Sequence, residues 1–292
     1  MGDGQPLLAM RAIVVLMRYA AFTVDVDRDA NLAEKGRYEA GSRALGGTET
    51  IPRFASSGKG LRMLAELLEE LGIRGTFFLE GDALRDIAHH YDVRGLLQKH
   101  EVACHGICHE DFTGESTGIC LSGEQIGEVA KESRSIVQDI IGRVPTGFRA
   151  PYQHIDEIGL GALAKAGFYY DSSMTEAMKE GKVGPREMNN GITEVPLACG
   201  EDRSGRKIVS YLWPMHEGKR TADEYVELAS SFRSGYLVLA THSWHLAETF
   251  KLGPLEPRES ASEVEKTRKV LEGMQDQGIR FQPIEEFLEC DR

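Results

Sequence analysis

Short runs of apolar and β-branched residues alternate with longer amphipathic segments along most of this 292-residue chain. The run at 19–25 is typical of a strand, and four leucines on one face predict a helix over 60–71. Gly72 follows that helix at the place where a left-handed residue commonly ends one. Ser122 and Gln125 have capping-box spacing, which predicts a helix from there to about residue 141.

The same periodicities predict the other elements. Further strands are expected at 74–79, 101–104, 146–148, 168–170, 192–195, 208–212, 236–240 and 279–281, and further helices at 83–99, 158–166, 222–232, 261–274 and 284–288. Repeated strand–helix order with short links predicts a mostly parallel sheet covered by helices. About seven or eight such units favour a closed or nearly closed β/α barrel. We therefore expect a single α/β domain over 19–292, after an N-terminal extension at 1–18.

Composition and charge narrow the class of protein. The chain is 41% hydrophobic and 27% charged, as in ordinary globular proteins. Its net charge of -12 argues against a nucleic-acid partner, because phosphate binding needs a basic face. The apolar run at 12–17 is too short for a signal core or a membrane span, and five cysteines do not suggest a disulfide framework. We expect a cytoplasmic protein with no membrane partner, and a homo-oligomer is compatible with the sequence.

Ionisable side chains gather where the predicted strands end. The four strand ends read Thr-Val-Asp-Val-Asp at 23–27, Cys-His-Gly-Ile-Cys-His at 104–109, Gly-Phe-Arg-Ala-Pro-Tyr at 147–152 and Leu-Ala-Thr-His at 239–242. In a β/α barrel the carboxyl ends of the strands share one rim, and reactive groups lie there. The sequence therefore predicts one site built from four strands.

Two histidines and two aspartates in these segments have the spacing of a metal site. His105 and His109 lie four apart, which would place both imidazoles on one side of a helical turn. With one aspartate they would form a two-His, one-carboxylate set that leaves positions open for water and substrate. Asp25 and Asp27 would point to the same side of a strand and repel unless a cation or an arginine separates them. Taken singly, the histidines could be loop residues and the aspartates a solvated strand end.

These segments resemble conserved blocks of the NodB-homology polysaccharide deacetylases (carbohydrate esterase family 4). In chain order, the blocks T-F-D-D, H-x-x-x-H, R-x-P-Y and L-x-x-H are matched by Phe22-Thr-Val-Asp25-Val-Asp27, His105-Gly-Ile-Cys-His109, Arg149-Ala-Pro151-Tyr152 and Leu239-Ala-Thr-His242. The extra valine in the first block is similar to the intracellular peptidoglycan-deacetylase-like and allantoinase-like branch. The family's tryptophan- and aspartate-containing block has no recognisable counterpart, so the acid that supports His242 stays open.

The resemblance implies a distorted (β/α)7 barrel and a role for each matched residue. Asp25 would be the catalytic base and His242 the general acid. Zn²⁺, or another divalent transition metal such as Co²⁺, would be bound by Asp27, His105 and His109. The substrate-binding residues would be Arg149, Pro151 and Tyr152, with Arg149 orienting Asp25 and the Tyr152 backbone amide contacting the oxyanion. His245, three residues beyond His242, could compete for the role of acid, but the L-x-x-H spacing favours His242.

The expected function is a metal-dependent hydrolase that removes an acetyl group from the amide nitrogen of an amino sugar or a related small amide. Its partner would be a small-molecule or carbohydrate substrate. One alternative is a cyclic imide or allantoin-type amidohydrolase of the same fold, which the full set of ligands disfavours. Another is a non-catalytic carbohydrate-binding barrel, which would need neither a base nor an acid.

Overall fold

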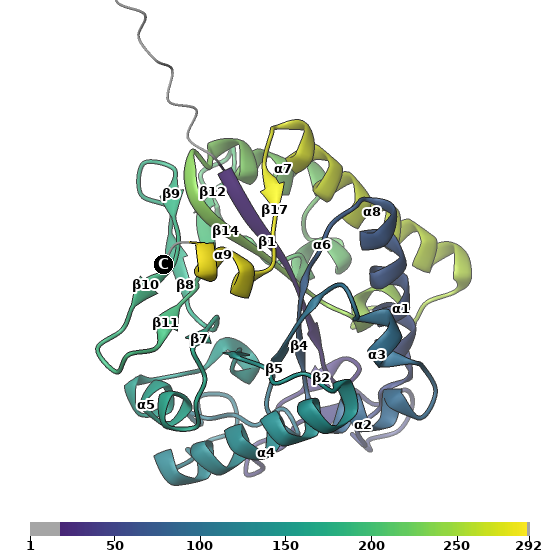
Figure 1. Ribbon diagram of the computed structural model, residues 1–292. Coiled ribbons are helices and arrows are strands. Elements are labelled where there is room, and N and C mark those ends of the chain that lie inside the picture. The colour runs from purple at the N-terminus through teal and green to yellow at the C-terminus, as the bar shows by residue number, and fades with distance from the viewer. Residues whose placement is uncertain (1–17, 291–292) are drawn as a thin grey trace, which may run out of the picture.

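Strand β1 (Arg18–Val26) lies in the middle of a curled sheet in the computed structural model, which describes residues 18–290 (Figure 1). Its parallel neighbours are β4 (Thr76–Leu79) and β14 (Ser234–His242). From its third residue onward every side chain of β1 is buried. A parallel strand with helices on its outer face is buried on both sides, which explains its continuous apolar run.

The sheet extends from β1 in both directions through parallel strands. On the β4 side it continues through β5 (Glu101–Cys104), β6 (Gly147–Phe148), β7 (Tyr170–Asp171), β11 (Thr193–Glu194) and the antiparallel β10 (Arg186–Glu187). On the β14 side it continues through β12 (Leu197–Glu201) and the antiparallel β13 (Lys207–Val209). The path ends at β10 and β13, so the described strands form a curled, open barrel, which confirms the predicted α/β fold in its distorted form.

Shorter strands complete this sheet and two separate hairpins. The strands β8 (Thr175–Ala177), β9 (Lys182–Val183) and β17 (Arg280–Phe281) pair with β12, β14 and β1. The hairpins are β2 (Asn31–Leu32) with β3 (Gly41–Ser42), and β15 (Glu248–Thr249) with β16 (Gly253–Pro254).

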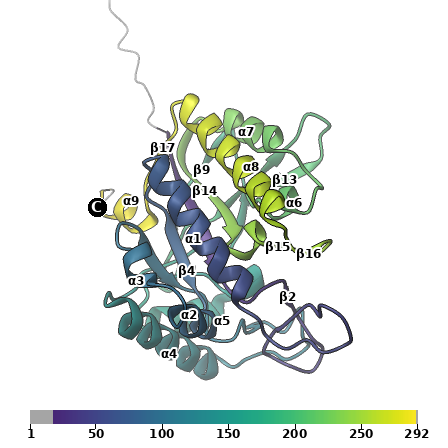
Figure 2. The same cartoon turned by 90° about the vertical axis from the view of Figure 1, so that its right-hand side faces the viewer.

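Helices cover the outside of the sheet. The longer ones are α1 (Ala55–Glu70), α2 (Gly81–Ala88), α4 (Gly123–Ile141), α5 (Glu157–Lys165), α7 (Ala222–Ser231), α8 (Pro257–Asp276) and α9 (Ile284–Cys290). The short ones are α3 (Val93–Leu96), α6 (Trp213–His216), η1 (Pro151–Gln153) and η2 (Trp244–Leu246). Figure 2 shows α1, α7 and α8 together over one side of the sheet, while α4 and α5 pack against each other farther along it.

Local signals placed most helices correctly. The capping box predicted at Ser122 and Gln125 is present, and α4 ends at Gly142, whose φ of 84° is left-handed. The single helix predicted over 83–99 is wrong, because the segment forms α2 and α3 with a break between them. At the break, the Asp92 carboxylate accepts a hydrogen bond from the Gly95 amide at 3.0 Å and caps a new helix.

The N-terminal extension predicted for 1–18 lies outside the described residues, as does the apolar run at 12–17, except that Arg18 already begins β1. All five cysteines are free. Among residues 18–290, no helix combines the length and apolar character that crossing a bilayer requires.

Candidate active site

A cavity of about 450 Å³ opens at the carboxyl ends of the central strands. Its lining residues come from segments far apart in the chain: Asp25, Asn31, His105, His109, Ser116, Ala150, Tyr152, Gln153, His154, Tyr211, Trp213, His242 and Phe250. Parallel strands deliver these side chains to one rim because all of them end on the same side of the sheet. The register pairs Asp25 of β1 directly with His242 of β14.

Asp27, His105 and His109 form a buried cluster that could hold a metal ion. One ligand atom from each residue lies within 4.8 Å of the other two. The His109 Nε2 and Asp27 Oδ2 atoms are 3.1 Å apart. The other two polar atoms, Asp27 Oδ1 and His109 Nδ1, are buried without a hydrogen-bond partner. Because buried polar atoms are normally satisfied, the free oxygen of Asp27 leaves coordination capacity that the described residues do not fill.

The histidines meet in a way that their spacing did not predict. Residues 105–109 form an irregular loop after β5, so the predicted helical turn is wrong. Gly106 has a φ of 75° and His109 a φ of 57°, and these two left-handed residues bend the chain back. The two imidazole rings face each other edge to face with centroids 5.3 Å apart. Backbone reversal, rather than helical periodicity, brings the ligands together.

Neighbouring groups orient the cluster. The Arg149 carbonyl oxygen lies 2.8 Å from His105 Nδ1, which fixes the proton there and leaves Nε2 as the free lone pair. The Asn31 amide donates a hydrogen bond of 2.7 Å to Asp27 Oδ2. Asn31 lies in the β2–β3 hairpin, so this loop contributes to the site as well as to its rim.

The protonation states of the cluster suit cation binding. Burial lowers the pKa of His105 to about 4 and that of His109 to about 3, so both imidazoles are neutral at physiological pH. Neutral imidazole is the form that ligates metals, and the 3.1 Å contact with Asp27 is therefore no ion pair. Burial raises the pKa of Asp27 to about 7, and the nearby charge of Asp25 adds to this effect. A bound cation would oppose that rise.

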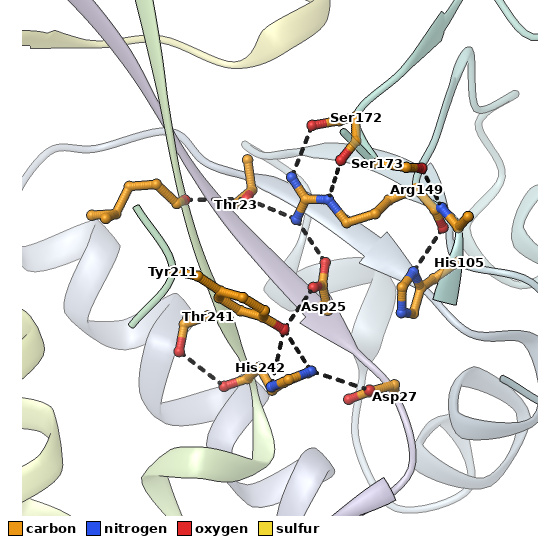
Figure 3. Close-up of polar contacts among 12 residues, drawn as sticks. Thr23, Asp25, Asp27, His105, Arg149, Ser172, Ser173, Tyr211, Thr241 and His242 are labelled. Carbon is orange, nitrogen blue, oxygen red and sulfur yellow. Dashed lines mark hydrogen bonds and ion pairs between the residues drawn. The ribbon is translucent and has the colours of Figure 1, made fainter. Parts of the chain in front are cut away.

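Asp25 is held as a carboxylate by Arg149. The Arg149 Nη1 donates to Asp25 Oδ1 at 2.8 Å and to Thr23 Oγ1 at 2.9 Å (Figure 3). The rest of the guanidinium donates to the carbonyl and hydroxyl oxygens of Ser172, at 2.8 and 2.9 Å. Burial alone would raise the pKa of Asp25, but Arg149, followed by His105 and His242, holds it below its usual value. Of the two aspartates, Asp25 therefore keeps its charge more readily.

His242 faces both aspartates across the cavity. Its Nε2 lies 2.6 Å from the Tyr211 hydroxyl and 3.7 Å from Asp27 Oδ2. The same hydroxyl donates a hydrogen bond of 3.3 Å to Asp25 Oδ2 (Figure 3). Burial lowers the pKa of His242, while the charges of Asp27 and Asp25 work in the opposite direction. Tyr211 thus connects the predicted base to the predicted acid.

The segment 149–152 passes from β6 into a strained turn. Pro151 is buried at the start of η1, and Tyr152 has a left-handed φ of 58°. Five non-glycine residues in the described chain have positive φ, and three of them, His109, Tyr152 and Gln153, line the cavity. The Tyr152 ring packs edge to face on His109, with centroids 4.5 Å apart. Such strain is often retained where a binding site needs a particular backbone direction.

Sequence analysis missed several residues of the cavity. Tyr211 falls in the strand predicted at 208–212, but β13 ends at Val209, so Tyr211 and Trp213 follow the strand. Phe250 comes from the β15–β16 hairpin. A pair of aromatic residues just after a strand was the available signal for Tyr211 and Trp213. His245, in contrast, is fully buried and does not line the cavity.

Comparison with known sequences gives a consistent assignment. The polysaccharide deacetylase family profile matches residues 58–170, which include the His105–His109 and Arg149–Tyr152 segments but neither Asp25, Asp27 nor His242. A peptidoglycan deacetylase-like protein of Gibberella zeae is 29% identical over 119 residues, or 40% of this chain and 33% of that protein. A peptidoglycan deacetylase of Helicobacter pylori is 28% identical over 116 residues, or 39% of this chain and 37% of that protein. The matches thus span about a third of the length of these curated relatives.

Solved structures share the fold over nearly the whole chain. A protein from Mycobacterium smegmatis assigned to the polysaccharide deacetylases has a TM-score of 0.63 at 20% identity and covers 94% of this chain and 90% of its own. A family 4 carbohydrate esterase from Streptomyces lividans, solved with acetate, has a TM-score of 0.50 at 16% identity, with 91% and 92% covered. A family 4 pseudoenzyme from Bacillus anthracis has a TM-score of 0.52 at 11% identity, with 92% and 65% covered. The sequence matches confirm the predicted resemblance to the polysaccharide deacetylases, and the solved structures show that the fold is shared.

Proposed function

We propose that this protein is a metal-dependent hydrolase that removes an acetyl group from the amide nitrogen of an amino sugar or a related small amide. One observation carries the proposal. A buried, incompletely satisfied Asp27–His105–His109 cluster lies beside the Asp25–Arg149 pair and His242. The side chains of Asp25, His105, His109 and His242 line one cavity. Because the same fold includes a pseudoenzyme, the residues of the site support activity better than the fold does.

The three ligand residues fit a divalent transition metal such as Zn²⁺ or Co²⁺. Two ligand atoms bound to one tetrahedral ion at about 2.0–2.1 Å lie roughly 3.4 Å apart, close to the 3.1 Å between His109 Nε2 and Asp27 Oδ2. Two neutral imidazoles and one carboxylate are also a donor set that such ions favour. When bound there, the ion would polarise the acyl carbonyl and lower the pKa of a coordinated water.

Asp25 is placed to act as the base. Arg149 occupies Oδ1 at 2.8 Å, whereas Oδ2 has only the longer 3.3 Å contact with Tyr211 and can accept a proton from the attacking water. The guanidinium keeps the carboxylate charged in a buried place, where it would otherwise be protonated more easily. Proton transfer to a positioned base of this kind contributes roughly 10²–10⁴-fold to the rate.

His242 lies across the cavity and would donate a proton to the leaving nitrogen. Amide hydrolysis needs this step because an unprotonated amine anion is a very poor leaving group. The oxyanion formed by attack would be stabilised by the backbone amide of Tyr152, at the turn after Pro151. The half-buried Tyr152 ring and the nearby Trp213 would contact the apolar face of a sugar ring.

The size of the cavity bears on the substrate. A volume of about 450 Å³ lies within the roughly 300–1,000 Å³ of small-molecule sites. A cytoplasmic location, as the sequence predicts, would also favour a soluble amino-sugar conjugate over a cell-wall polymer.

The direct test is acetate release by the purified, Zn²⁺-loaded protein. N-acetylglucosamine, its short oligomers, a soluble N-acetylhexosamine conjugate and a cyclic imide would be compared at equal concentration. We expect acetate from at least one N-acetyl sugar and no opening of the imide ring. Imide hydrolysis without acetate release would overturn the proposal in favour of a cyclic amidohydrolase.

A substitution at the base separates catalysis from binding. Asp25→Asn keeps the shape of the side chain and should lower kcat by roughly 10²–10⁴-fold while metal is retained. Glu115→Gln is the control, because Glu115 is an exposed carboxylate on the loop at the cavity rim and lies away from Asp25. Unchanged turnover in Asp25→Asn would remove the base from the mechanism.

A further inference from the structure

The proposed acid, His242, has a partner that neither the sequence blocks nor the comparisons assign. We propose that His245 is a positioning residue that holds a proton on Nδ1 of His242, so that Nε2 is the nitrogen that gives and takes protons in the cavity. Glu217 fixes His245 in turn. The inference rests on the proposed function only for its catalytic consequence, since the tautomer itself can be measured without turnover.

The geometry joins the two rings at matching nitrogens. The Nδ1 atoms of His242 and His245 are 3.3 Å apart. The 3₁₀ turn η2 follows β14 and places His245 beneath His242, three residues on. The side chain of His245 is completely buried, whereas 14% of the His242 side chain is exposed to the cavity. His245 therefore supports His242 from behind and cannot itself reach a substrate.

The far side of His245 determines which nitrogen carries its proton. Its Nε2 has no hydrogen-bond partner, and the Oε1 atom of the Glu217 carboxylate lies 3.8 Å from it. Glu217 Oε1 accepts a hydrogen bond of 2.7 Å from the Phe250 amide, which anchors it there. A neutral His245 is most stable with its proton on Nε2, towards this negative charge. Its Nδ1 lone pair then faces His242 and accepts a hydrogen bond from that ring.

The hydrogen bond from Nδ1 of His242 to His245 can form whether His242 is neutral or protonated. When His242 is neutral, Nδ1–H donates to His245, and the Tyr211 hydroxyl turns its single hydrogen from Asp25 to Nε2, which at 2.6 Å is closer to it than Nδ1 at 3.2 Å. When His242 is protonated, Nδ1–H still donates to His245, Nε2–H points into the cavity, and the hydroxyl can donate to Asp25 at 3.3 Å. In each state the proton that moves is the one on Nε2. A neutral histidine acting as acceptor thus takes the place that a carboxylate would fill.

Packing restricts the orientation of the His245 ring relative to the His242 ring. The His245 ring lies between the Trp244 ring, with centroids 3.8 Å apart, and the His216 ring, at 5.2 Å and nearly parallel. Helix α1 presses on the preceding turn at Gly60, where an added Cβ would come within 1.8 Å of the Ser243 carbonyl oxygen. The hydroxyls of Ser57 and Ser243 are also hydrogen-bonded at 2.5 Å. The turn therefore has little freedom, and an orientation set by His245 would persist.

A comparison of two leaving groups tests the catalytic role. An amide needs a general acid, whereas 4-nitrophenyl acetate releases a stable anion and barely needs one. His245→Phe keeps a buried ring but removes the acceptor, so kcat for the N-acetyl substrate should fall roughly 10–100-fold, with KM unchanged and ester hydrolysis within about threefold. His245→Asn should recover part of the loss, because its side-chain oxygen can accept from Nδ1–H of His242. An equal loss on both substrates would mean a merely structural role and would overturn the proposal.

His216→Phe is the matched control. His216 is equally buried and stacks on the same ring, but its Nδ1 pairs with Glu263 at 2.9 Å rather than with His242. This variant should lower Tm while leaving the ratio of amide to ester turnover within about threefold of the wild type. A ratio that changes as much as in His245→Phe would assign the effect to packing.

The spectroscopic readout does not depend on activity. In ¹⁵N NMR of the Zn²⁺-loaded protein, at a pH where His242 is neutral, we expect the Nδ1–H tautomer in the wild type. In His245→Phe the proton should move to Nε2, where the Tyr211 hydroxyl can accept it. An Nε2–H tautomer in the wild type, or no change in the variant, overturns the inference even if a substrate is hydrolysed. The expected switch in a protein without hydrolytic activity would retain the positioning role and reject the proposed function alone.

Discussion

Two buried carboxyl groups at opposite ends of the same sheet, those of Glu101 and Asp27, both have pKa values raised to about 7. Their hydrogen-bond partners, however, are different. Glu101 begins β5, at the amino end of the strands, whereas Asp27 follows the carboxyl end of β1. Glu101 accepts hydrogen bonds from Thr76 and Tyr170, each at 2.6 Å, and from the Glu285 amide at 3.1 Å. Both of its oxygens are used.

Asp27 is as buried as Glu101 but less well satisfied. Its Oδ2 contacts Asn31 and His109, and its Oδ1 has no protein partner. Burial raises both pKa values, so a pKa shift does not by itself distinguish a structural carboxyl group from a functional one. The difference lies in the unused coordination capacity: Glu101 has hydrogen bonds on both oxygens, whereas one oxygen of Asp27 has no partner within the described chain.

Replacing Asp27 and Glu101 separately should give the largest difference in metal content and turnover. Asp27→Asn should lose bound metal and lower kcat/KM by roughly 10³-fold or more, because metal polarisation contributes several kcal/mol and each 1.36 kcal/mol is a factor of ten. Glu101→Gln should retain about one equivalent of metal and near wild-type turnover. Metal analysis and acetate release check both variants, and equal metal content in the two would break the distinction.

The pH dependence of stability should contain a contribution from Glu101. Its folded pKa of about 7 lies above the usual 4.5, so between these values the folded state binds more protons than the unfolded state. This contribution to stability is fully present below about pH 4.5 and is lost as pH rises through about 7, by up to about 3 kcal/mol. Urea unfolding at several pH values should show a flatter profile for Glu101→Gln. Parallel profiles in the wild type and the variant would contradict this assignment.

Zn²⁺ should increase the stability only of proteins that keep the Asp27–His105–His109 cluster. Zn²⁺ at 100 times its Kd adds about 2.7 kcal/mol to the free energy of unfolding, because it binds the folded state. Thermal unfolding of the wild type and of Glu101→Gln should therefore shift upward by a few degrees on addition of Zn²⁺, and a chelator should reverse the shift. Asp27→Asn should show almost none. A similar shift in Asp27→Asn would place the ion elsewhere.

Arg149→Lys addresses the support of the base and has the smallest expected effect. Lysine cannot donate to Asp25, Thr23 and Ser172 together, so we expect a loss of roughly 10–100-fold in kcat. With the hydrogen bond from the guanidinium lost and the positive charge less closely placed, the pKa of Asp25 should rise, and the acidic limb of the kcat/KM profile should move to higher pH. If the acidic limb of the kcat/KM profile does not move, its pKa belongs to a group other than Asp25.

The sequence predicted the fold wherever local chemistry and burial agreed. The Ser122–Gln125 capping box and the buried run of β1 are examples, since each depends on neighbours in the chain. The helix predicted over 83–99 is wrong because Asp92 caps a second helix inside an apolar pattern that looked continuous. The segment 174–212 was predicted only in part, because its short strands depend on partners outside their own local sequence. The strand β8 pairs with β12, about twenty residues later, and β9 pairs with β14.

The candidate site was also predicted only in part from the sequence. Four segments, matched to known blocks, named candidate site residues. Of these, Asp25, His105, His109, Tyr152 and His242 line the cavity, whereas Asp27, Arg149 and Pro151 do not. The roles assigned to Asp25, Arg149 and His242 stay predictions that the contacts support. Tyr211 was missed because its link to Asp25 and His242 joins positions 186 and 31 residues apart. No local pattern records such a contact.

The sequence alone determined which kinds of side chain stand at the strand ends, since strand periodicity and block spacing are local properties. Only the tertiary structure decided how they face one another: the bend at Gly106 and His109, the Arg149 bridge and the His242–His245 contact. Hydrogen-bond direction and burial depend on atoms brought from distant segments, and these are fixed only when the sheet is assembled.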